Sequence, residues 1–340
     1  MKRNYVIPAV LTLTGIGIIT SLLLLILLNP FSSSEQPEDA QQHNECTERG
    51  LANKEPTLRT TTCKKSVDLK QIFSGGPGKD GIPAIHNPAF VPYDQSPVSD
   101  TTRGILTTIN NETRFYPYNI LAWHEIVNDS AGSTHYAITF CPLCDSGIVF
   151  DRTVENETLQ FGVSGLLYQS NLLMYDNETE SLWSQAGRRA IVGDYTGTQL
   201  DVLPFQLLSF QEVKTLYPNG MILSTDTGYN RDYDLTPYSG YLENEEIFFP
   251  VSVNDKRFPS KELMYVVPFK NVSLTFPYRQ FQEGEQNFII EGHPITITRI
   301  KNEIRATSDG VQYPGYFELW FSWATHNQEH GIVLDINTAE

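Results

Sequence analysis

The longest apolar run of the chain lies near its N-terminus, where residues 5–28 are almost wholly apolar. Lys2 and Arg3 precede this run, and no charged residue follows it until Glu35. A membrane-spanning helix needs about 20 apolar residues, whereas the apolar region of a cleaved signal peptide is shorter, at roughly 7–15 residues. We therefore expect residues 1–30 to form a retained membrane anchor, with residues 5–28 inside the membrane.

The charges beside the anchor predict its orientation. Lys2 and Arg3 favour an N-terminus inside the cell, which places the rest of the chain outside. Residues 31–66 are polar and irregular, so we interpret them as an extracytoplasmic tether. A β-rich domain is expected to follow over residues 67–340. The pattern thus predicts a single-pass protein of the cell membrane whose domain faces outward.

Beyond the tether, short β-prone segments alternate with turn residues. Long helical periodicity is scarce, while aromatic, Gly and Pro residues are frequent. The pattern predicts strands at residues 105–109, 113–116, 137–140, 147–150, 159–163 and 221–224. It predicts helices at residues 118–127 and 205–216.

The chain also contains a weak internal repeat. Residues 111–121 resemble residues 271–281, and a β-prone segment precedes each copy. A second β-prone segment follows each copy, at residues 136–140 and 295–298. We therefore expect a mainly β fold, or an α+β fold with short helices. It would consist of two weakly repeated β-rich units, preceded by one N-terminal transmembrane helix.

Charge and short motifs narrow the environment of the domain. The 24 Lys and Arg residues against 40 Asp and Glu give a formal net charge of −16, which argues against nucleic acid as a partner. Cys46 and Cys63 flank a polar stretch that a disulfide would close, and such a bond persists in an oxidising compartment. Several Asn-x-Ser/Thr motifs predict a glycoprotein. They begin at Asn111, Asn128, Asn156, Asn177 and Asn271.

Cys141 and Cys144 lie two residues apart, between a strand-like segment and a turn signal at residues 145–147. Two sulfurs at this spacing form a disulfide, act as a redox pair or hold one metal ion. A strand follows them rather than a helix, which argues against a thioredoxin-like fold. The second copy of the repeat has no cysteine, so the framework does not depend on the sulfurs. Cys141 and Cys144 are therefore the candidate catalytic residues.

A metal site at these cysteines would need further ligands. A closed structural zinc site has four ligands, and the chain has no second Cys-x-x-Cys pair. The candidate metal ligands are Cys141, Cys144 and His124, a set that suits zinc with an open position, or copper. The alternative is that His124 is a core residue that binds no metal. The sequence leaves the cofactor unknown.

Two further stretches, residues 164–185 and 227–241, mix polar, aromatic and Gly residues without periodicity. Such loops commonly line pockets, but they also form structural turns whose Tyr hydroxyls satisfy backbone groups, and both interpretations stay open. The candidate pocket residues are Ser164, Asn171, Tyr175, Trp183, Gln185, Tyr229, Arg231, Asp232 and Tyr233.

Nine segments of the chain, which include the cysteine pair within residues 139–144, together resemble the domain of unknown function 3179 family. The resemblance covers about residues 80–330, and the chain departs from the commoner family pattern at Asp145, where relatives often carry Gly or Asn. The family has no established activity. Some relatives are described as selenoproteins, which favours a redox role for a thiol. The matching segments are residues 116–118, 123–129, 139–144, 149–152, 161–167, 171–176, 181–185, 227–233 and 320–326.

Our leading hypothesis is an extracytoplasmic thiol-based redox protein, an oxidoreductase whose cysteine pair works alone or with a bound metal. The alternative is a non-catalytic module in which the pair forms a structural disulfide and the aromatic loops bind a ligand or partner. The sequence specifies neither the substrate nor the redox partner.

Overall fold

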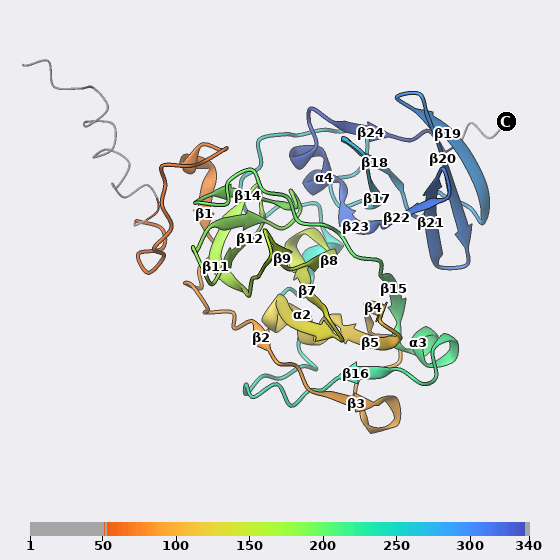
Figure 1. Cartoon of the computed structure of the whole chain (residues 1–340), viewed down its shortest axis with the longest axis horizontal. Coiled ribbons are helices and arrows are strands. Elements are labelled where there is room, and N and C mark those ends of the chain that lie inside the picture. Colours follow the sequence, from red (N-terminus) through yellow and green to blue (C-terminus); the bar gives the residue numbers. More distant parts are fainter. Residues whose placement is uncertain (1–50, 52, 337–340) are drawn as a thin grey trace, which may run out of the picture.

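The computed structural model describes residue 51 and residues 53–336 (Figure 1). No helix within these residues is long and apolar enough to cross a membrane. The expected anchor at residues 5–28 and the expected partner of Cys63, Cys46, lie outside the described residues. The described end of the expected tether lies on the domain, since the backbone N–H of Ser66 donates to the carbonyl of Ile191 at 2.9 Å.

The expectation of a mainly β fold is confirmed. Strands from several sheets dominate the described chain, and its α-helices are each seven residues long. These helices are α2 (Tyr118–His124), α3 (Phe210–Leu216) and α4 (Trp320–His326). Short 3₁₀ turns are η1 (Leu69–Gln71), η2 (Tyr93–Gln95), η3 (Pro142–Cys144) and η4 (Tyr241–Glu243).

An eight-stranded sheet forms the centre of the molecule. Strands β6, β7 and β8 are mostly buried on both faces, so the polar residues within them need internal partners. In β6, Asn128 bonds the backbone of Phe161, and Asp129 accepts from Arg114. Along β7, Ala137 and Cys141 face one core while Ile138 and Phe140 face another. In order across the sheet, the strands are β2 (Ile85–His86), β6 (Ile126–Ala131), β7 (Thr134–Cys141), β8 (Ser146–Asp151), β23 (Tyr316–Leu319), β17 (Leu263–Phe269), β18 (Val272–Pro277) and β24 (Gly331–Val333).

A five-stranded sheet covers the face to which Cys141 points. Its Met174 and Trp183 pack in the same core as Cys141, and each buried side chain of this size contributes about 1.5–3 kcal/mol. Its strands are, in order, β1 (Ile72–Ser74), β11 (Phe161–Tyr168), β12 (Asn171–Asp176), β13 (Leu182–Ser184) and β14 (Arg189–Val192). A small hairpin of β9 (Thr153–Val154) and β10 (Glu157–Thr158) lies beside it in sequence.

A second five-stranded sheet packs against the other face, with Ile105 and Tyr116 in the core of Ile138 and Phe140. Helix α3 continues from this sheet, and a capping box between Ser209 and Glu212 fixes its start. The strands are, in order, β15 (Gln206–Ser209), β4 (Arg103–Ile109), β5 (Glu112–Pro117), β16 (Met221–Leu223) and β3 (Phe90–Pro92).

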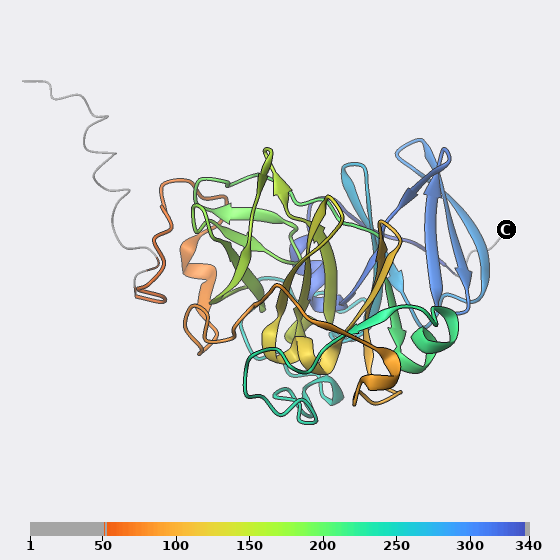
Figure 2. The same ribbon diagram turned by 60° about the horizontal axis from the view of Figure 1, so that its bottom comes forward.

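A four-stranded sheet lies at the end of the molecule next to the C-terminus (Figure 1). The sheet that contains β11 and β12 lies at the opposite end in both views, so the central sheet separates them (Figure 2). The strands of the four-stranded sheet are β19 (Gly284–Ile290), β20 (His293–Ile300), β21 (Glu303–Ser308) and β22 (Val311–Tyr313).

Most predicted strands are present, and the two copies of the repeat both begin as hairpins. The loops at residues 110–111 and 270–271 each connect paired antiparallel strands, and their first residues, Asn110 and Lys270, have φ values of 49° and 52°. The hairpins belong to different sheets, because β4 and β5 pair outside the central sheet while β17 and β18 lie within it.

Both helix predictions were too long. The helix expected at residues 118–127 ends at His124, because Glu125 has a φ of 57° and β6 begins at Ile126. The helix expected at residues 205–216 begins only at Phe210, since residues 206–209 form β15 and pair with β4. In each case an adjacent sheet edge takes residues whose local pattern is helical.

A long irregular segment connects β16 to β17. We call residues 224–262 the cover segment; apart from η4 it contains neither helix nor strand. Its Tyr241 packs in the core of Cys141 and Cys144, and the partly buried Ile247 and Phe258 pack against the same core. Loops longer than about 12–15 residues in a compact domain are commonly functional. The cover segment therefore marks where a site would be enclosed.

Candidate functional site

The two cysteines stand at a tight turn in the central sheet. Cys141 ends β7 and pairs with Ser146, the first residue of β8. Pro142 opens η3, where its fixed φ and missing N–H cost nothing. Asp145 closes the turn with a φ of 43° and accepts a hydrogen bond from Arg103 at 3.1 Å. The turn directs both sulfurs inward, so Cys141 is 2% exposed and Cys144 is fully buried.

The sulfur of Cys144 contacts the hairpin turn between β11 and β12. Its S–H donates to the carbonyl of Ser170 at 3.3 Å, and the side-chain N–H of Asn171 donates to the sulfur at 3.4 Å. Gln169 and Ser170 both have positive φ values, of 54° and 58°, as a two-residue hairpin loop requires. The hairpin thereby presents the backbone carbonyl of Ser170 and the side-chain amide of Asn171 to the same sulfur.

A buried network of amides and hydroxyls fixes Asn171. Its side-chain N–H also donates to Gln185 Oε1 at 2.9 Å, and its own oxygen accepts from the backbone N–H of Ala186 at 2.9 Å. Gln185 Oε1 also accepts from Ser146 Oγ at 2.8 Å, and Gln185 Nε2 donates to Thr139 Oγ1 at 3.2 Å. Because these groups are fully buried and satisfied, the network holds one geometry around Cys144.

The two sulfurs differ in acidity because their surroundings differ. Burial alone would raise the pKa of Cys144, but hydrogen bonding by Cys141, Asn171 and Ser322 outweighs burial and lowers that pKa. Burial raises the pKa of Cys141, and the interaction with Cys144 and the nearby Glu125 carboxyl raises it further. Cys144 is therefore the more acidic of the two sulfurs, and Cys141 is the less acidic one.

A buried glutamate lies on the Cys141 side. Glu125 follows α2 and its carbonyl accepts the backbone N–H of Phe140 at 2.8 Å, one residue before Cys141. Burial raises the pKa of Glu125 to about 8, although a hydrogen bond from Tyr238 opposes the rise. The Tyr238 hydroxyl belongs to the cover segment and lies 3.4 Å from Glu125 Oε1. The cover segment thus contacts the carboxyl that neighbours Cys141.

A second buried glutamate lies on the Cys144 side. Glu318 in β23 is fully buried, and its Oε2 accepts a hydrogen bond from Ser322 Oγ of α4 at 2.9 Å. Burial and the negative charge of Cys144 raise the pKa of Glu318 well above its usual value. Buried polar atoms here have no hydrogen-bond partner among the described residues, a rare state in folded proteins. These atoms are Glu318 Oε1, Tyr316 Oη, Tyr241 Oη and Ser170 Oγ.

The structure brings two of the expected pocket residues, Asn171 and Gln185, to Cys144 and separates the others from it. Ser164 Oγ donates to the carbonyl of Leu173 at 2.5 Å, and Trp183 Nε1 donates to Asp176 at 2.9 Å, so both serve the five-stranded sheet. The Tyr175 hydroxyl donates to Asp80 at 2.8 Å. These three side chains have structural partners of their own.

The remaining expected pocket residues belong to the cover segment and lie near α2. Tyr229 and Tyr233 pack against the His124 ring with centroids 5.4 Å and 5.8 Å away. Arg231 lies over the Trp123 ring, 5.5 Å from its centroid, while Asp232 caps its own turn by accepting the backbone N–H of Asp234 at 3.1 Å. This group fixes the cover segment to α2.

His124 does not join the cysteines as a metal ligand. Its Nδ1 lies 2.7 Å from the carbonyl oxygen of Pro83, and its Nε2 lies 2.6 Å from the Tyr233 hydroxyl, so both ring nitrogens are occupied. In the described part of the chain no cluster of three or more His, Cys, Asp or Glu side chains is placed to hold a metal ion. The expected set of Cys141, Cys144 and His124 is therefore not assembled, because α2 directs His124 toward the cover segment.

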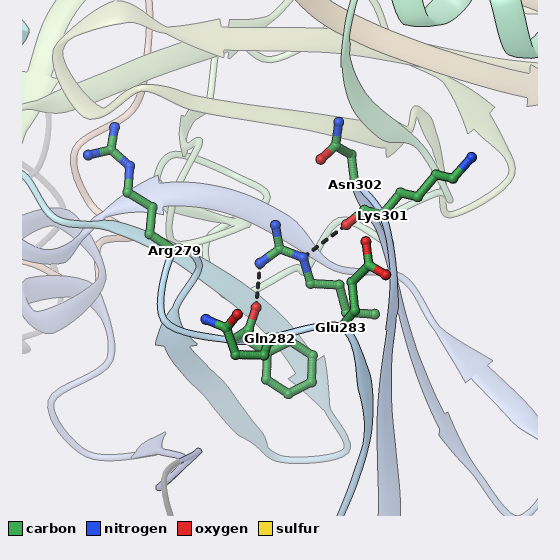
Figure 3. A pocket seen from close by; sticks show the side chains of 7 residues that line it. Arg279, Gln282, Glu283, Lys301 and Asn302 are labelled. Atoms are coloured by element: carbon green, nitrogen blue, oxygen red, sulfur yellow. Dashed lines mark hydrogen bonds between the residues drawn. The ribbon is translucent and has the colours of Figure 1, made fainter.

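Two clefts open elsewhere on the described surface. One, of about 330 Å³, lies beside the four-stranded sheet, where the side chains of Gln282, Glu283 and Asn302 reach toward it (Figure 3). Its Arg299 is held by the backbone carbonyls of Phe281 and Lys301. The other, of about 540 Å³, lies between the cover segment and Phe321 of α4. Neither cleft is lined by Cys141 or Cys144.

Comparison with known proteins places the chain in a family. The family described as "Protein of unknown function (DUF3179)" matches residues 79–312. The chain belongs to the DUF3179 family. No curated protein and no solved structure gave a match. The DUF3179 segment contains Cys141, Cys144 and Asn171, but it ends before Glu318 and Ser322, which complete the site from β23 and α4.

The residues that sequence reasoning missed are the two glutamates and the groups that contact them. Glu318 is a single charge within the apolar run 316–321, and an isolated charge in a buried strand is a recognisable signal. Glu125 lies within the helix predicted over residues 118–127, where acidic residues are common, so nothing in the sequence distinguishes it. Tyr238 and Tyr241 lie in a segment without periodicity, so their approach to the sulfurs is a tertiary property.

Proposed function

We propose that this protein is a thiol oxidoreductase in which Cys141 and Cys144 cycle between a dithiol and a disulfide. What carries the proposal is the unequal environment of two neighbouring buried sulfurs. Cys144 accepts the amide of Asn171 and has a lowered pKa, while the pKa of Cys141 is raised. One thiolate beside one thiol is the state from which thiol–disulfide exchange proceeds.

The reaction is an exchange with a disulfide substrate. The Cys144 thiolate attacks one sulfur of the substrate, forms a mixed disulfide and releases the other half as a thiolate, which takes up a proton. Cys141 then loses its proton and attacks Cys144, so the Cys141–Cys144 disulfide forms and the second substrate thiol leaves. One substrate disulfide takes up two electrons from the pair and two protons, one from Cys141 and one from solvent, and becomes two thiols.

Access to the sulfurs requires movement of the cover segment. Both sulfurs are at most 2% exposed, and Tyr241 packs over them from η4. A substrate therefore reaches Cys144 after this segment opens, and closure afterwards excludes water from the exchange. The structural disulfide that we considered as the alternative is one outcome of the test below; the described residues hold Cys141 and Cys144 as thiols.

The test is a redox titration of the full chain in detergent. The protein is equilibrated with mixtures of reduced and oxidised glutathione, quenched and alkylated, and the peptide that contains both cysteines is weighed by mass spectrometry. We expect a reversible two-electron transition with one midpoint from both directions. A pair that stays reduced at every ratio, or a disulfide that survives every ratio, would refute the redox function.

A further inference from the structure

The side chain of Gln169 joins the cover segment to the turn that contacts Cys144. Gln169 Oε1 accepts a hydrogen bond from the backbone N–H of Ser252 at 2.7 Å, and Gln169 is only 4% exposed. The next residue of the turn, Ser170, accepts the S–H of Cys144 at 3.3 Å through its carbonyl. One two-residue turn therefore contacts both the Cys144 sulfur and the segment that covers it.

The residues of this turn are not the ones that its geometry favours. Gln169 and Ser170 both have positive φ values, and two-residue hairpin turns of this kind favour Asn and Gly, because most side chains are strained there. A glycine in place of Gln169 would relieve the strain, but it would remove the amide that reaches Ser252. The Gln169 side chain is thus present at a conformational cost, which a role in binding explains.

Ser252 lies in a stretch of the cover segment where exposed and half-buried residues alternate. Ser252 is exposed, whereas Val251 and Val253 are half-buried and line the cleft of about 540 Å³. Val251 also packs against the core that contains both cysteines. The residue before the bonded N–H therefore directs its side chain toward the core of the cysteines, as a substrate cysteine in the same place would.

We propose that the substrate is a polypeptide disulfide, and that Gln169 binds the backbone N–H of the residue that follows the reacting substrate cysteine. This inference rests on the proposed redox function. In the closed protein Ser252 occupies the place of that residue, and Val251 occupies the place of the cysteine. Opening of the cover segment takes the N–H of Ser252 away, and a buried acceptor without a donor is unfavourable. A substrate backbone restores the hydrogen bond and brings its cysteine to Cys144.

The exchange with a polypeptide disulfide balances in two steps. The Cys144 thiolate attacks the bound peptide cysteine, a mixed disulfide forms, and the other peptide leaves as a thiolate that takes a proton from solvent. Cys141 then attacks Cys144, and its proton goes to the thiolate of the second peptide as that peptide leaves. The cysteine pair loses two electrons, and the peptide disulfide gains them.

Single-turnover kinetics of the reduced full chain in detergent test the role of Gln169. The peptide probe is the blocked, symmetric disulfide of Pro-Cys-Ser-Val-Asn, which copies residues 250–254 with cysteine in place of Val251. The small probe is hydroxyethyl disulfide, which has no amide. The measured quantity is the ratio of the second-order rate constants for the peptide and the small probe. A change in how often the cover segment opens affects both rate constants and cancels in this ratio.

Gln169→Gly should lower the ratio about tenfold, which corresponds to about 1.4 kcal/mol and is within the range of one hydrogen bond. Ser170→Gly is the matched control, because it relieves strain in the same turn and keeps both the Ser170 carbonyl and the Gln169 amide. It should leave the ratio unchanged. A purely structural role of Gln169 would change both rate constants by the same factor.

Methylated peptides test the same contact in the wild type, without any substitution in the protein. N-methylation of the peptide serine removes the N–H that Gln169 would bind, so the rate constant should fall about tenfold in the wild type and little in Gln169→Gly. N-methylation of the peptide valine is the control and should have a small effect in both proteins.

The outcomes separate this inference from the proposed function. An unchanged ratio in Gln169→Gly, or equal losses on serine N-methylation in both proteins, would overturn the role of Gln169. If hydroxyethyl disulfide oxidises the cysteine pair and the peptide does not, the redox function stands and the polypeptide substrate is wrong. If neither probe oxidises the pair in the wild type, the proposed function itself fails.

Discussion

The surroundings of Cys141 and Cys144 differ more than their spacing in the sequence suggests. Cys144 lies against a buried network of amides and hydroxyls that belongs to two sheets. Its charge also helps to raise the pKa of the fully buried Glu318. Cys141 lies beside Glu125, whose hydroxyl partner, Tyr238, comes from the irregular cover segment. One sulfur is thus held by the framework, and the other is next to the part of the molecule most able to move.

This difference teaches that a Cys-x-x-Cys pair need not depend on a helix N-terminus to make one sulfur acidic. In this fold hydrogen bonding by Cys141, by the side-chain amide of Asn171 and by Ser322 lowers the pKa of Cys144 although burial raises it. The four predictions that follow test the asymmetry, starting with the largest effect.

The largest effect should come from exchanging the two sulfurs for oxygen one at a time. With a small disulfide such as hydroxyethyl disulfide, Cys141→Ser should form a stable mixed disulfide at Cys144, because the resolving thiol is missing. Cys144→Ser should form adducts more slowly by a factor on the order of 100, because the remaining thiol keeps its proton. Intact-protein mass spectrometry over time measures both. Equal rates of adduct formation in the two variants would contradict the difference in acidity between Cys141 and Cys144.

The second effect concerns the amide network on the Cys144 side. Asn171→Leu leaves the backbone N–H of Ala186 without its acceptor and the Cys144 sulfur without its donor. We expect the free energy of unfolding to fall by about 2–4 kcal/mol, since each unsatisfied buried group costs roughly 1–3 kcal/mol. Urea unfolding followed by fluorescence measures it. Asn287→Leu, at an exposed position of β19, is the matched control and should change stability by less than about 0.5 kcal/mol. Similar losses in the free energy of unfolding of both variants would mean that the buried network contributes no more to stability than an exposed hydrogen bond.

The third effect is a pH dependence that originates on the Cys141 side. Burial raises the pKa of Glu125 to about 8, so between about pH 4.3 and 8 the folded protein binds a proton that the unfolded chain has lost. Stability should therefore be greatest at low pH within this range and fall as the pH rises, at up to about 1.4 kcal/mol per pH unit.

Glu125→Gln should flatten this dependence, and Glu246→Gln, on the exposed part of the cover segment, should leave it as in the wild type. Glu318 acts in the same direction, so the informative quantity is the difference between wild type and Glu125→Gln. Urea unfolding at several pH values measures that difference. A dependence that survives unchanged in Glu125→Gln would show that this carboxyl ionises normally in the folded protein.

The smallest effect should come from a residue that the structure separates from both sulfurs. Tyr175→Phe removes a hydroxyl that donates to Asp80 at 2.8 Å and leaves the thiol site untouched. We expect a stability change within about 1 kcal/mol and the wild-type midpoint in glutathione titration. A shifted midpoint would mean that the five-stranded sheet also influences the redox potential of the thiol pair, in addition to the groups that contact Cys141 and Cys144.

The sequence predicts the strands better than the helices, and the cysteine pair better than its neighbours. Alternation and turn residues locate β4, β5, β7 and β8 because those signals are local. The end of α2 could not be predicted, since Glu125 adopts a positive φ only where β6 turns into the central sheet. Asn171 and Gln185 were found through composition, whereas Glu318 approaches Cys144 only because β23 pairs with β8. The metal set with His124 was wrong because the direction in which a helix points its side chains depends on packing.

The glycosylation motifs also show that a local sequence pattern does not reveal which residues are buried. Asn128 matches the motif, but it is buried in β6, and its side chain bonds both the N–H and the carbonyl of Phe161 at 2.8 Å. A buried asparagine with both polar atoms in use cannot carry a sugar in the folded state. The motifs at Asn111, Asn156, Asn177 and Asn271 lie at exposed positions. A three-residue motif contains no information about burial, so structure must separate these cases.

The cover segment has a consequence for the speed of any reaction at the sulfurs. If a reagent meets Cys144 only while residues 224–262 are displaced, the two events happen in sequence. At low reagent concentration the rate of modification rises in proportion to concentration. At high concentration it reaches a plateau equal to the opening rate, and that plateau is the same for reagents of different intrinsic reactivity. The maximum turnover rate would then equal the opening rate of the cover segment. The reactivity of the two sulfurs would determine only the fraction of openings that lead to a reaction.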